Sequence, residues 1–343
     1  MKGTYFLGNK EFKTDMMNLS KPEKDNVLIK IAACGICGTD VHIYNGGKGS
    51  AEVTPPIILG HEFAGEIVAV GDQVDCVQVG DHVTVDPNIY CGKCHFCRNG
   101  KKQLCENMKA VGVTQDGGFA EYCIVPQAQC IKLNPEIPLK YGAMVEPLAC
   151  CLHGIDRTGI RQGDTVCVIG GGAIGLMMVQ LAKLAGASKI ILSEPVAMRR
   201  EIAVKVGADL VIDPINEDLQ KKLKEYTGTE GVDIVIECVG KIAATRQAFT
   251  AAKRGATILL FSVADPNAVY ELNVYDVFQK ELKIVGSFVN PDTHERAAAL
   301  IGSGKIILEP IITHSFALDR LEEAIRMQMS SESIKVIIEP ANK

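Results

Sequence analysis

A set of three glycines between an apolar strand and a helix constrains this chain more than any other feature. The glycines are Gly170, Gly172 and Gly175. They follow the apolar run Thr165–Ile169, and a helical pattern continues to about Ala185. In such a loop the first glycine makes a tight turn, the second lets the backbone approach a pyrophosphate, and the third lets helix and strand pack closely. The helix amino terminus faces the anion, so Ala173 and Ile174 are expected to bind the cofactor too. A lone glycine set also fits a flexible turn, but with this strand and helix it predicts a dinucleotide site.

An acidic residue, Glu194, ends the next predicted strand, Lys189–Ser193. A carboxylate at this position accepts hydrogen bonds from ribose hydroxyls and repels a 2′-phosphate, which predicts NAD rather than NADP. Arg199 and Arg200 follow closely, and an arginine there can hold that phosphate, so Arg199 is a candidate cofactor contact. The interpretation we favour for both arginines is that they are solvent-exposed helix charges.

The pattern of elements changes along the chain. The first half predicts short strands, as in Val27–Ala33 and Phe63–Val70, whereas strands and helices alternate after Thr165. Such alternation is typical of a parallel, doubly wound sheet, and 343 residues are enough for two domains. Beyond residue 281 a strand, a helix and a final helix–strand pair are predicted. Periodicity alone leaves open whether this tail extends the sheet or returns to the first domain.

Composition excludes several classes of protein. The net charge of −5 argues against a nucleic-acid binder with a broad basic face. No apolar run approaches the roughly 20 residues that span a bilayer. The first residues lack the apolar core of a secretory signal, so a cytoplasmic protein with neither a membrane nor a nucleic-acid partner is expected.

Four of the thirteen cysteines lie close together in the sequence and predict a structural zinc site in a lobe of about residues 88–108. They are Cys91, Cys94, Cys97 and Cys105. Four thiolates complete the tetrahedral shell of zinc and leave no position for a substrate. The odd total and the irregular spacing of the others favour a reducing compartment over a disulfide framework. Four further cysteines are interpreted as small buried apolar residues: Cys76, Cys123, Cys167 and Cys238.

A second set of candidate ligands is dispersed along the chain and consists of Cys37, His61 and Glu62. Taken singly, they also fit a buried thiol, a core histidine and a surface carboxylate. Three mixed ligands with an open fourth position are what a Lewis-acid zinc requires. Spacing alone leaves both interpretations open.

Together these motifs resemble the zinc-containing medium-chain dehydrogenase family over essentially the whole chain. The resemblance also rests on Gly-Asp-His-Val at residues 80–83 and Asp-Gly-Gly-Phe-Ala-Glu-Tyr at residues 116–122. It implies an α/β protein with a GroES-like, mainly-β catalytic domain of residues 1–147 and 281–343. A Rossmann domain of residues 148–280 would bind NAD.

The resemblance also implies roles for individual residues. Two zinc ions per chain are expected, the catalytic one held by Cys37, His61 and Glu62, with Glu146 as a nearby or alternating ligand. Thr39 and His42 would relay the proton of the alcohol, and hydride would pass to NAD. Homodimers or homotetramers are implied as well.

The resemblance is compatible with more than one class of substrate. Glu146-Pro147-Leu148 resembles the sorbitol and butanediol dehydrogenase branch, which implies a secondary alcohol, polyol or vicinal diol as the substrate. The run from Cys34 to Asn45 resembles the L-threonine 3-dehydrogenases, which are the alternative, and a polyol phosphate is a further one. A non-catalytic zinc-binding module is the alternative from another class, but it leaves the glycine loop unexplained.

Overall fold

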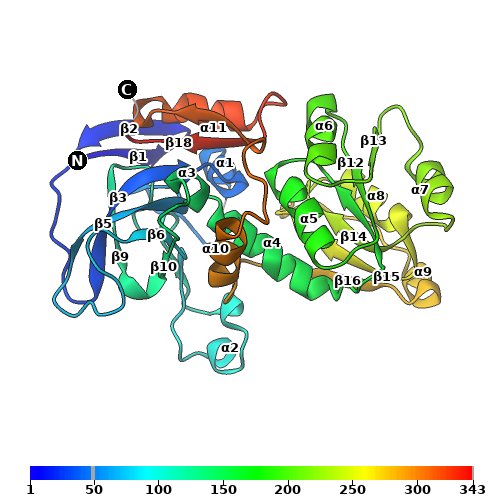
Figure 1. Cartoon of the computed structure of the whole chain (residues 1–343), viewed down its shortest axis with the longest axis horizontal. Coiled ribbons are helices and arrows are strands. Elements are labelled where there is room, and N and C mark those ends of the chain that lie inside the picture. The colour runs from blue at the N-terminus through cyan, green and yellow to red at the C-terminus, as the bar shows by residue number, and fades with distance from the viewer. Residues whose placement is uncertain (48–50, 342–343) are drawn as a thin grey trace. The chain divides into compact units, whose positions relative to one another are not determined.

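The computed structural model describes residues 1–47 and 51–341, which form two compact units (Figure 1). One unit contains Met1–Ala149 together with the chain from Pro291 onward, and the other is Cys150–Asn290. Helix α4 (Val145–Thr158) begins in the first unit and continues in the second.

Strands dominate the first unit. Before the chain leaves it, the elements are β1 (Lys2–Gly8), β2 (Glu11–Met16), β3 (Asn26–Gly35), α1 (Gly38–Tyr44), β4 (Ile57–Ile58), β5 (Glu62–Val70), β6 (His82–Val85), β7 (Asn88–Ile89), α2 (His95–Arg98), the 3₁₀ turn η1 (Lys102–Leu104), β8 (Lys109–Ala110), β9 (Tyr122–Pro126), η2 (Gln127–Gln129), β10 (Cys130–Lys132) and α3 (Leu139–Gly142). The returning chain adds α10 (His294–Gly302), β17 (Ile312–Phe316), η3 (Leu318–Arg320), α11 (Leu321–Gln328) and β18 (Lys335–Ile338).

The larger sheet of this unit has the order β10-β6-β5-β3-β18-β17, with β9 also paired to β3. Strand β3 therefore lies between a strand from the first half of the chain and a strand from its end. Its antiparallel register places Gly35 opposite Glu62 on one side and opposite Ile337 on the other. This register later decides which side chains meet at the candidate active site.

The second unit is a parallel sheet with helices in the connections. Its elements after α4 are β11 (Thr165–Ile169), α5 (Ala173–Leu184), β12 (Lys189–Ser193), α6 (Ala197–Lys205), β13 (Leu210–Ile212), α7 (Leu219–Thr227), β14 (Val232–Glu237), α8 (Ile242–Ala251), β15 (Ala252–Leu260), α9 (Val274–Lys280) and β16 (Lys283–Gly286). The strand order is β13-β12-β11-β14-β15-β16, and each pairing is parallel. The central strands are buried on both faces, which explains their nearly continuous apolar sequences.

The topology of this sheet indicates where a ligand binds. The chain moves from β11 to β12 and β13 on one side, then crosses to β14, β15 and β16 on the other. Ligands of open α/β sheets bind at the carboxyl ends of the strands where the order reverses. Here that point lies between β11 and β14, directly where Gly170 follows β11. The predicted α/β fold, with a mainly-β domain and a doubly wound parallel sheet, is confirmed.

The tail is divided between the two units. Strand β16 pairs in parallel with β15, whereas the chain from Pro291 onward belongs to the first unit. The predicted return at residue 281 therefore lies too early, because β16 still forms the edge of the parallel sheet. The other predicted boundary, at residues 147 and 148, falls inside α4 near the observed one.

The cysteines form no disulfide in the described residues. Cys123 and Cys167 are buried and Cys238 is partly buried, but Cys76 is exposed, so its interpretation as a buried residue is wrong. It lies between β5 and β6, outside either core, and its Sγ donates a hydrogen bond to Gln127 Oε1 at 3.1 Å. No helix among the described residues has the length and hydropathy needed to span a membrane.

Candidate active site

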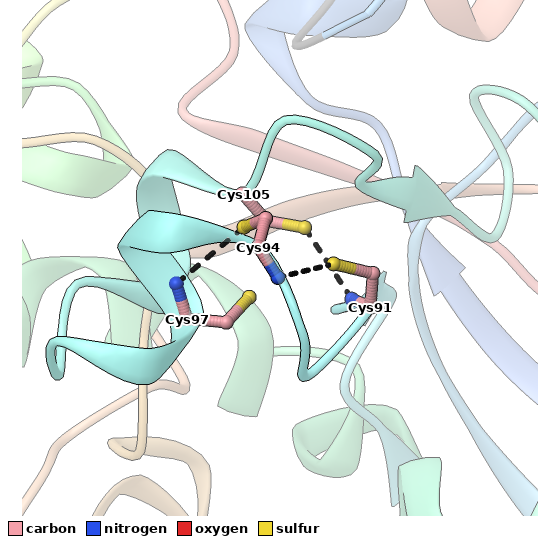
Figure 2. Close-up of side chains that lie close together, drawn as sticks. All are labelled: Cys91, Cys94, Cys97 and Cys105. Carbon is pink, nitrogen blue, oxygen red and sulfur yellow. Dashed lines mark hydrogen bonds between the residues drawn. The ribbon is translucent and has the colours of Figure 1, made fainter.

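The four-cysteine lobe is closed at its base by the short antiparallel pair β7 and β8. Figure 2 shows its four cysteine side chains gathered around one point, and their Sγ atoms all lie within 4.8 Å of one another. Backbone N–H groups point at the sulfurs, as from Cys94 to Cys91 Sγ at 3.4 Å and from Cys97 to Cys94 Sγ at 3.5 Å. Gly92, at φ +69°, makes the left-handed turn that brings the first two cysteines together.

The electrostatics of this lobe favour a cation. N–H groups of Lys93 and Cys94 lower the pKa of Cys91 to about 6. Burial and the neighbouring thiols raise the pKa of Cys97 to about 12, because further negative charge is opposed at this spacing. A zinc ion held by the four thiolates would remove that conflict, because its positive charge offsets theirs. The lobe can therefore hold a structural zinc.

A second donor cluster forms in the first unit, where α1 begins and β5 begins. Cys37 is the residue before α1, and Glu62 is the first residue of β5, directly after His61. One donor atom from each of the three lies within 4.8 Å of the others. Zinc bond lengths place tetrahedral ligand atoms about 3.4–3.8 Å apart, so small movements suffice. A thiol, an imidazole and a carboxylate are a donor set that zinc accepts with one position left open.

Asp40 supports two of these donors from the first turn of α1. Its Oδ2 accepts a hydrogen bond from Cys37 N–H at 2.9 Å, and its Oδ1 lies 3.6 Å from His61 Nδ1. Burial lowers the pKa of His61, but the negative charges of Asp40 and Cys37 outweigh it and raise the pKa well above its ordinary value. The same charges would favour a metal cation held by this imidazole. Carboxylates commonly orient ligating histidines by accepting a hydrogen bond from the ring, and Asp40 Oδ1 faces His61 Nδ1 just beyond hydrogen-bond distance.

Glu146 lies in the first turn of α4 and is 6% exposed. Its charge raises the pKa of His61 and of Lys335, so it lies near the cluster. It is not one of the three grouped donors in the described residues, so the structure does not bring it together with them as a ligand. Thr39 is half-buried and His42 is exposed, both on α1.

The sequence did not predict one contact of this cluster. The ammonium of Lys335, at the start of β18, forms an ion pair with Glu62 Oε2 and donates a hydrogen bond to the carbonyl of Ile36 at 3.0 Å. Burial lowers the pKa of Lys335, but Glu62 and Cys37 outweigh it and raise the pKa. A lysine inside the apolar run Ile334–Ile338 was the available signal, since a buried strand rarely contains a charge without a partner.

The glycine loop of the second unit has a distinct geometry at each glycine. Gly170 has φ +101°, which a side chain would strain. A Cβ on Gly175 would overlap the carbonyl oxygen of Gly170, whereas a Cβ on Gly172 would meet no heavy atom within 4 Å. Ala173 and Ile174 form the first turn of α5, whose amino terminus opens towards this loop. The open side at Gly172 is where a phosphate can approach the backbone.

Glu194 is buried directly after β12, where its Oε2 accepts a hydrogen bond from Gly171 N–H at 2.6 Å. Arg199 and Arg200 are half-buried, which corrects the expectation of solvent-exposed helix charges. Arg200 Nη1 donates to the carbonyl of Glu194 at 2.8 Å, and its Nη2 lies 3.2 Å from Asp213 Oδ2. Arg200 therefore stabilises the turn after β12, a role that its position in sequence did not indicate.

Known proteins share this architecture. Residues 23–135 match the alcohol dehydrogenase GroES-like domain, and residues 173–303 match the zinc-binding dehydrogenase family. An L-threonine 3-dehydrogenase of Pyrococcus horikoshii is 39% identical, with 94% of this chain and 93% of that protein covered. The chain belongs to the zinc-containing medium-chain dehydrogenase family.

Two further members illustrate the range of this dehydrogenase family. D-arabinitol dehydrogenase 1 of Uromyces fabae is 35% identical, with 99% of this chain and 97% of that protein covered. The crystal structure of a zinc-binding dehydrogenase from Sinorhizobium meliloti, bound to NADP, has 39% identity and a TM-score of 0.95, with 99% of each chain covered. This chain is thus a dehydrogenase of the alcohol and polyol type, and these relatives leave the substrate and the choice between NAD and NADP open.

Proposed function

We propose that this dehydrogenase oxidises a vicinal diol or short polyol at a secondary carbon and transfers the hydride to NAD. Cys37, His61 and Glu62 would hold a catalytic zinc, and the four-cysteine lobe would hold a structural one. When bound, the catalytic zinc supplies Lewis-acid polarisation that makes the substrate hydroxyl more acidic. We also infer a homodimer or homotetramer, which the native mass in solution would test.

The residues around the donor cluster have separate tasks in this proposal. Asp40 holds the backbone of Cys37 through a hydrogen bond, and its Oδ1 faces Nδ1 of His61 at 3.6 Å, where it would orient the ring once that contact tightens. Thr39 would accept the hydroxyl proton, and His42, which is exposed, would pass it to solvent. The loop of Gly170, Gly172 and Gly175 would bind the pyrophosphate of the cofactor.

The observation that carries the substrate proposal is Glu146. The carboxylate of Glu146 is buried and its charge acts on His61, but it does not belong to the group of three donors. A hydroxyl next to the reacting one can donate a hydrogen bond to this carboxylate, whereas ethanol has no second donor to offer. Hydrogen bonds to charged groups contribute about 1.5–3 kcal/mol, which corresponds to at least about tenfold in catalytic efficiency.

The preference for NAD rests on Glu194. Its carboxylate accepts N–H groups of the glycine loop and of Val196, so it is oriented where an adenosine ribose would bind. A 2′-phosphate would meet this negative charge. Arg200, which could otherwise attract such a phosphate, is already paired with Asp213.

The decisive experiment is an NAD-reduction screen over vicinal diols, polyols, polyol phosphates, L-threonine and ethanol. Diols and short polyols should exceed ethanol by at least about tenfold in kcat/KM, and Glu146→Gln should remove most of that advantage. Glu66→Gln is the matched control, because Glu66 is an exposed carboxylate on β5. If ethanol is the better substrate, the diol proposal is wrong.

L-threonine is the second candidate, and the identity of 39% to an L-threonine 3-dehydrogenase favours it. Its ammonium group could also bind Glu146, but its carboxylate requires a cation that is not already paired. Lys335 is occupied by Glu62. A higher kcat/KM for L-threonine than for every diol and polyol in the screen would establish this second candidate instead.

A further inference from the structure

The ion pair of Lys335 and Glu62 is almost completely excluded from solvent. The Lys335 side chain is 5% exposed and the Glu62 side chain 2%. Removing two charges from water costs several kcal/mol per ion before their attraction is counted, and apolar residues of similar size often stabilise a protein at least as well. A buried lysine in a strand of isoleucine and valine is therefore a poor choice for stability alone. We therefore look for a functional role of Lys335 in its effect on Glu62.

The strand register brings the two side chains together. Glu62 on β5 and Ile337 on β18 both lie opposite Gly35 on β3. Because side chains alternate along a strand, Lys335 shares a face with Ile337 and hence with Glu62. A Cβ at Gly35 would overlap Glu62 Oε2 and lie 2.9 Å from Lys335 Cε. The missing side chain of Gly35 thus leaves the space in which the ion pair forms.

This arrangement has a consequence for the charge of the metal site. A zinc ion held by a thiolate from Cys37, a carboxylate from Glu62 and neutral His61 would have no net charge, and the carboxylates of Glu146 and Asp40 would add negative charge around it. The ammonium of Lys335 offsets part of that charge. It also pairs with Oε2 of Glu62, so the carboxylate would be shared between the lysine and a bound metal.

We propose that Lys335 is a positioning residue for the catalytic zinc, which it keeps electrophilic and exchangeable by competing for the carboxylate of Glu62. This inference rests on the proposed function of the three-donor cluster. Without Lys335, Glu62 gives all of its charge to the metal and the nearby positive charge disappears. Because of both changes, the site binds the metal more tightly and the metal becomes a weaker Lewis acid.

The test is the rate at which a chelating dye removes zinc from the native protein. Wild type should lose one zinc quickly and the four-cysteine zinc slowly. Lys335→Met should slow the fast phase by about tenfold and lower kcat more than it changes KM. Lys335→Arg, which keeps the charge, should restore release to within about twofold of wild type. With Co²⁺ in the fast site, the visible absorption bands should shift in Lys335→Met and not in Lys335→Arg.

The controls separate this role from a structural one. Lys132→Met is matched, because Lys132 pairs with Asp81 at 2.9 Å on the surface of the same unit, and it should release zinc like wild type. In a Glu62→Gln background Lys335→Met should slow release clearly less than it does in wild type, because the coupled partner is absent and only the loss of the nearby positive charge remains. If Lys335→Met does not fold, Lys335→Gln retains an N–H donor for Ile36 and carries the same prediction.

The sign of the effect decides the outcome. A purely structural lysine would give faster zinc release when replaced, because the site loosens. Faster or unchanged release in the uncharged variant therefore overturns the role of Lys335. A wild-type protein that binds only the slow zinc overturns the proposed function itself, which is a distinguishable result.

Discussion

Replacing Gly172 by alanine should separate cofactor binding from folding. Gly172 precedes α5 with φ −71° and ψ −176°, a conformation that alanine adopts easily, and its Cβ would meet no protein atom within 4 Å. The smaller freedom of the unfolded chain favours alanine by about 0.4–1 kcal/mol, and the weaker amino-terminal cap offsets that gain. The midpoint temperature of thermal unfolding should therefore stay within a few degrees of the wild-type value.

Binding of NAD should fall sharply in the same variant. The added methyl group occupies the open side of the loop, where a pyrophosphate would accept backbone N–H groups. The loss of one or two charge-assisted hydrogen bonds of about 1.5–3 kcal/mol each weakens binding by roughly a hundredfold.

The assay is calorimetric titration with NAD, alongside thermal unfolding without it. Gly175→Ala is the contrasting variant, because its Cβ would overlap the carbonyl oxygen of Gly170 and unfolding should occur at a clearly lower temperature. Wild-type affinity for NAD in Gly172→Ala would refute the assignment of this loop.

Three further predictions address the metals, the cofactor and acid stability. Cys37→Ala should lose turnover and the fast zinc yet stay folded, whereas Cys94→Ala should lose the slow zinc and unfold at a lower temperature; metal analysis with thermal unfolding checks both. Glu194→Ala should bind NAD more weakly, and the ratio of kcat/KM with NAD to kcat/KM with NADP should fall. Equal kcat/KM with the two cofactors in wild type would contradict the proposed role of Glu194. Burial and nearby Lys102 lower the pKa of His294 to about 3 from 6.5, so this group stays neutral in the fold while it gains a proton in the unfolded chain. Its contribution is lost as the pH falls below 6.5, by roughly 2 kcal/mol at pH 5. His294→Phe should flatten the decline in unfolding free energy between pH 7 and 5. Asp86 faces this ring at 3.6 Å, and burial raises its pKa to about 6, so its proton uptake stabilises the fold as the pH falls and opposes the decline. A decline as steep as in wild type would therefore contradict the role of His294.

Local patterns in the sequence determined the features that depend on neighbouring residues. The strands Thr165–Ile169, Lys189–Ser193 and Val232–Glu237 lie where their apolar runs predict them. The four cysteines of the lobe meet because short spacings and a turn at Gly92 leave them little alternative. The glycine loop follows its strand for the same reason, since the motif and its supports are contiguous.

Only the tertiary structure decided which distant residues share an environment. Lys335 and Glu62 are 273 positions apart and meet because two strands flank β3 in a register that no local pattern encodes. The pairing of Arg200 with Asp213 depends likewise on packing between separate elements. The chain returns to the first unit only at Pro291, because β16 pairs with β15 and so keeps the preceding residues in the parallel sheet. A strand's apolar pattern specifies which face is buried, but its partners are selected by the packing of the whole sheet, and those partners complete the candidate metal site.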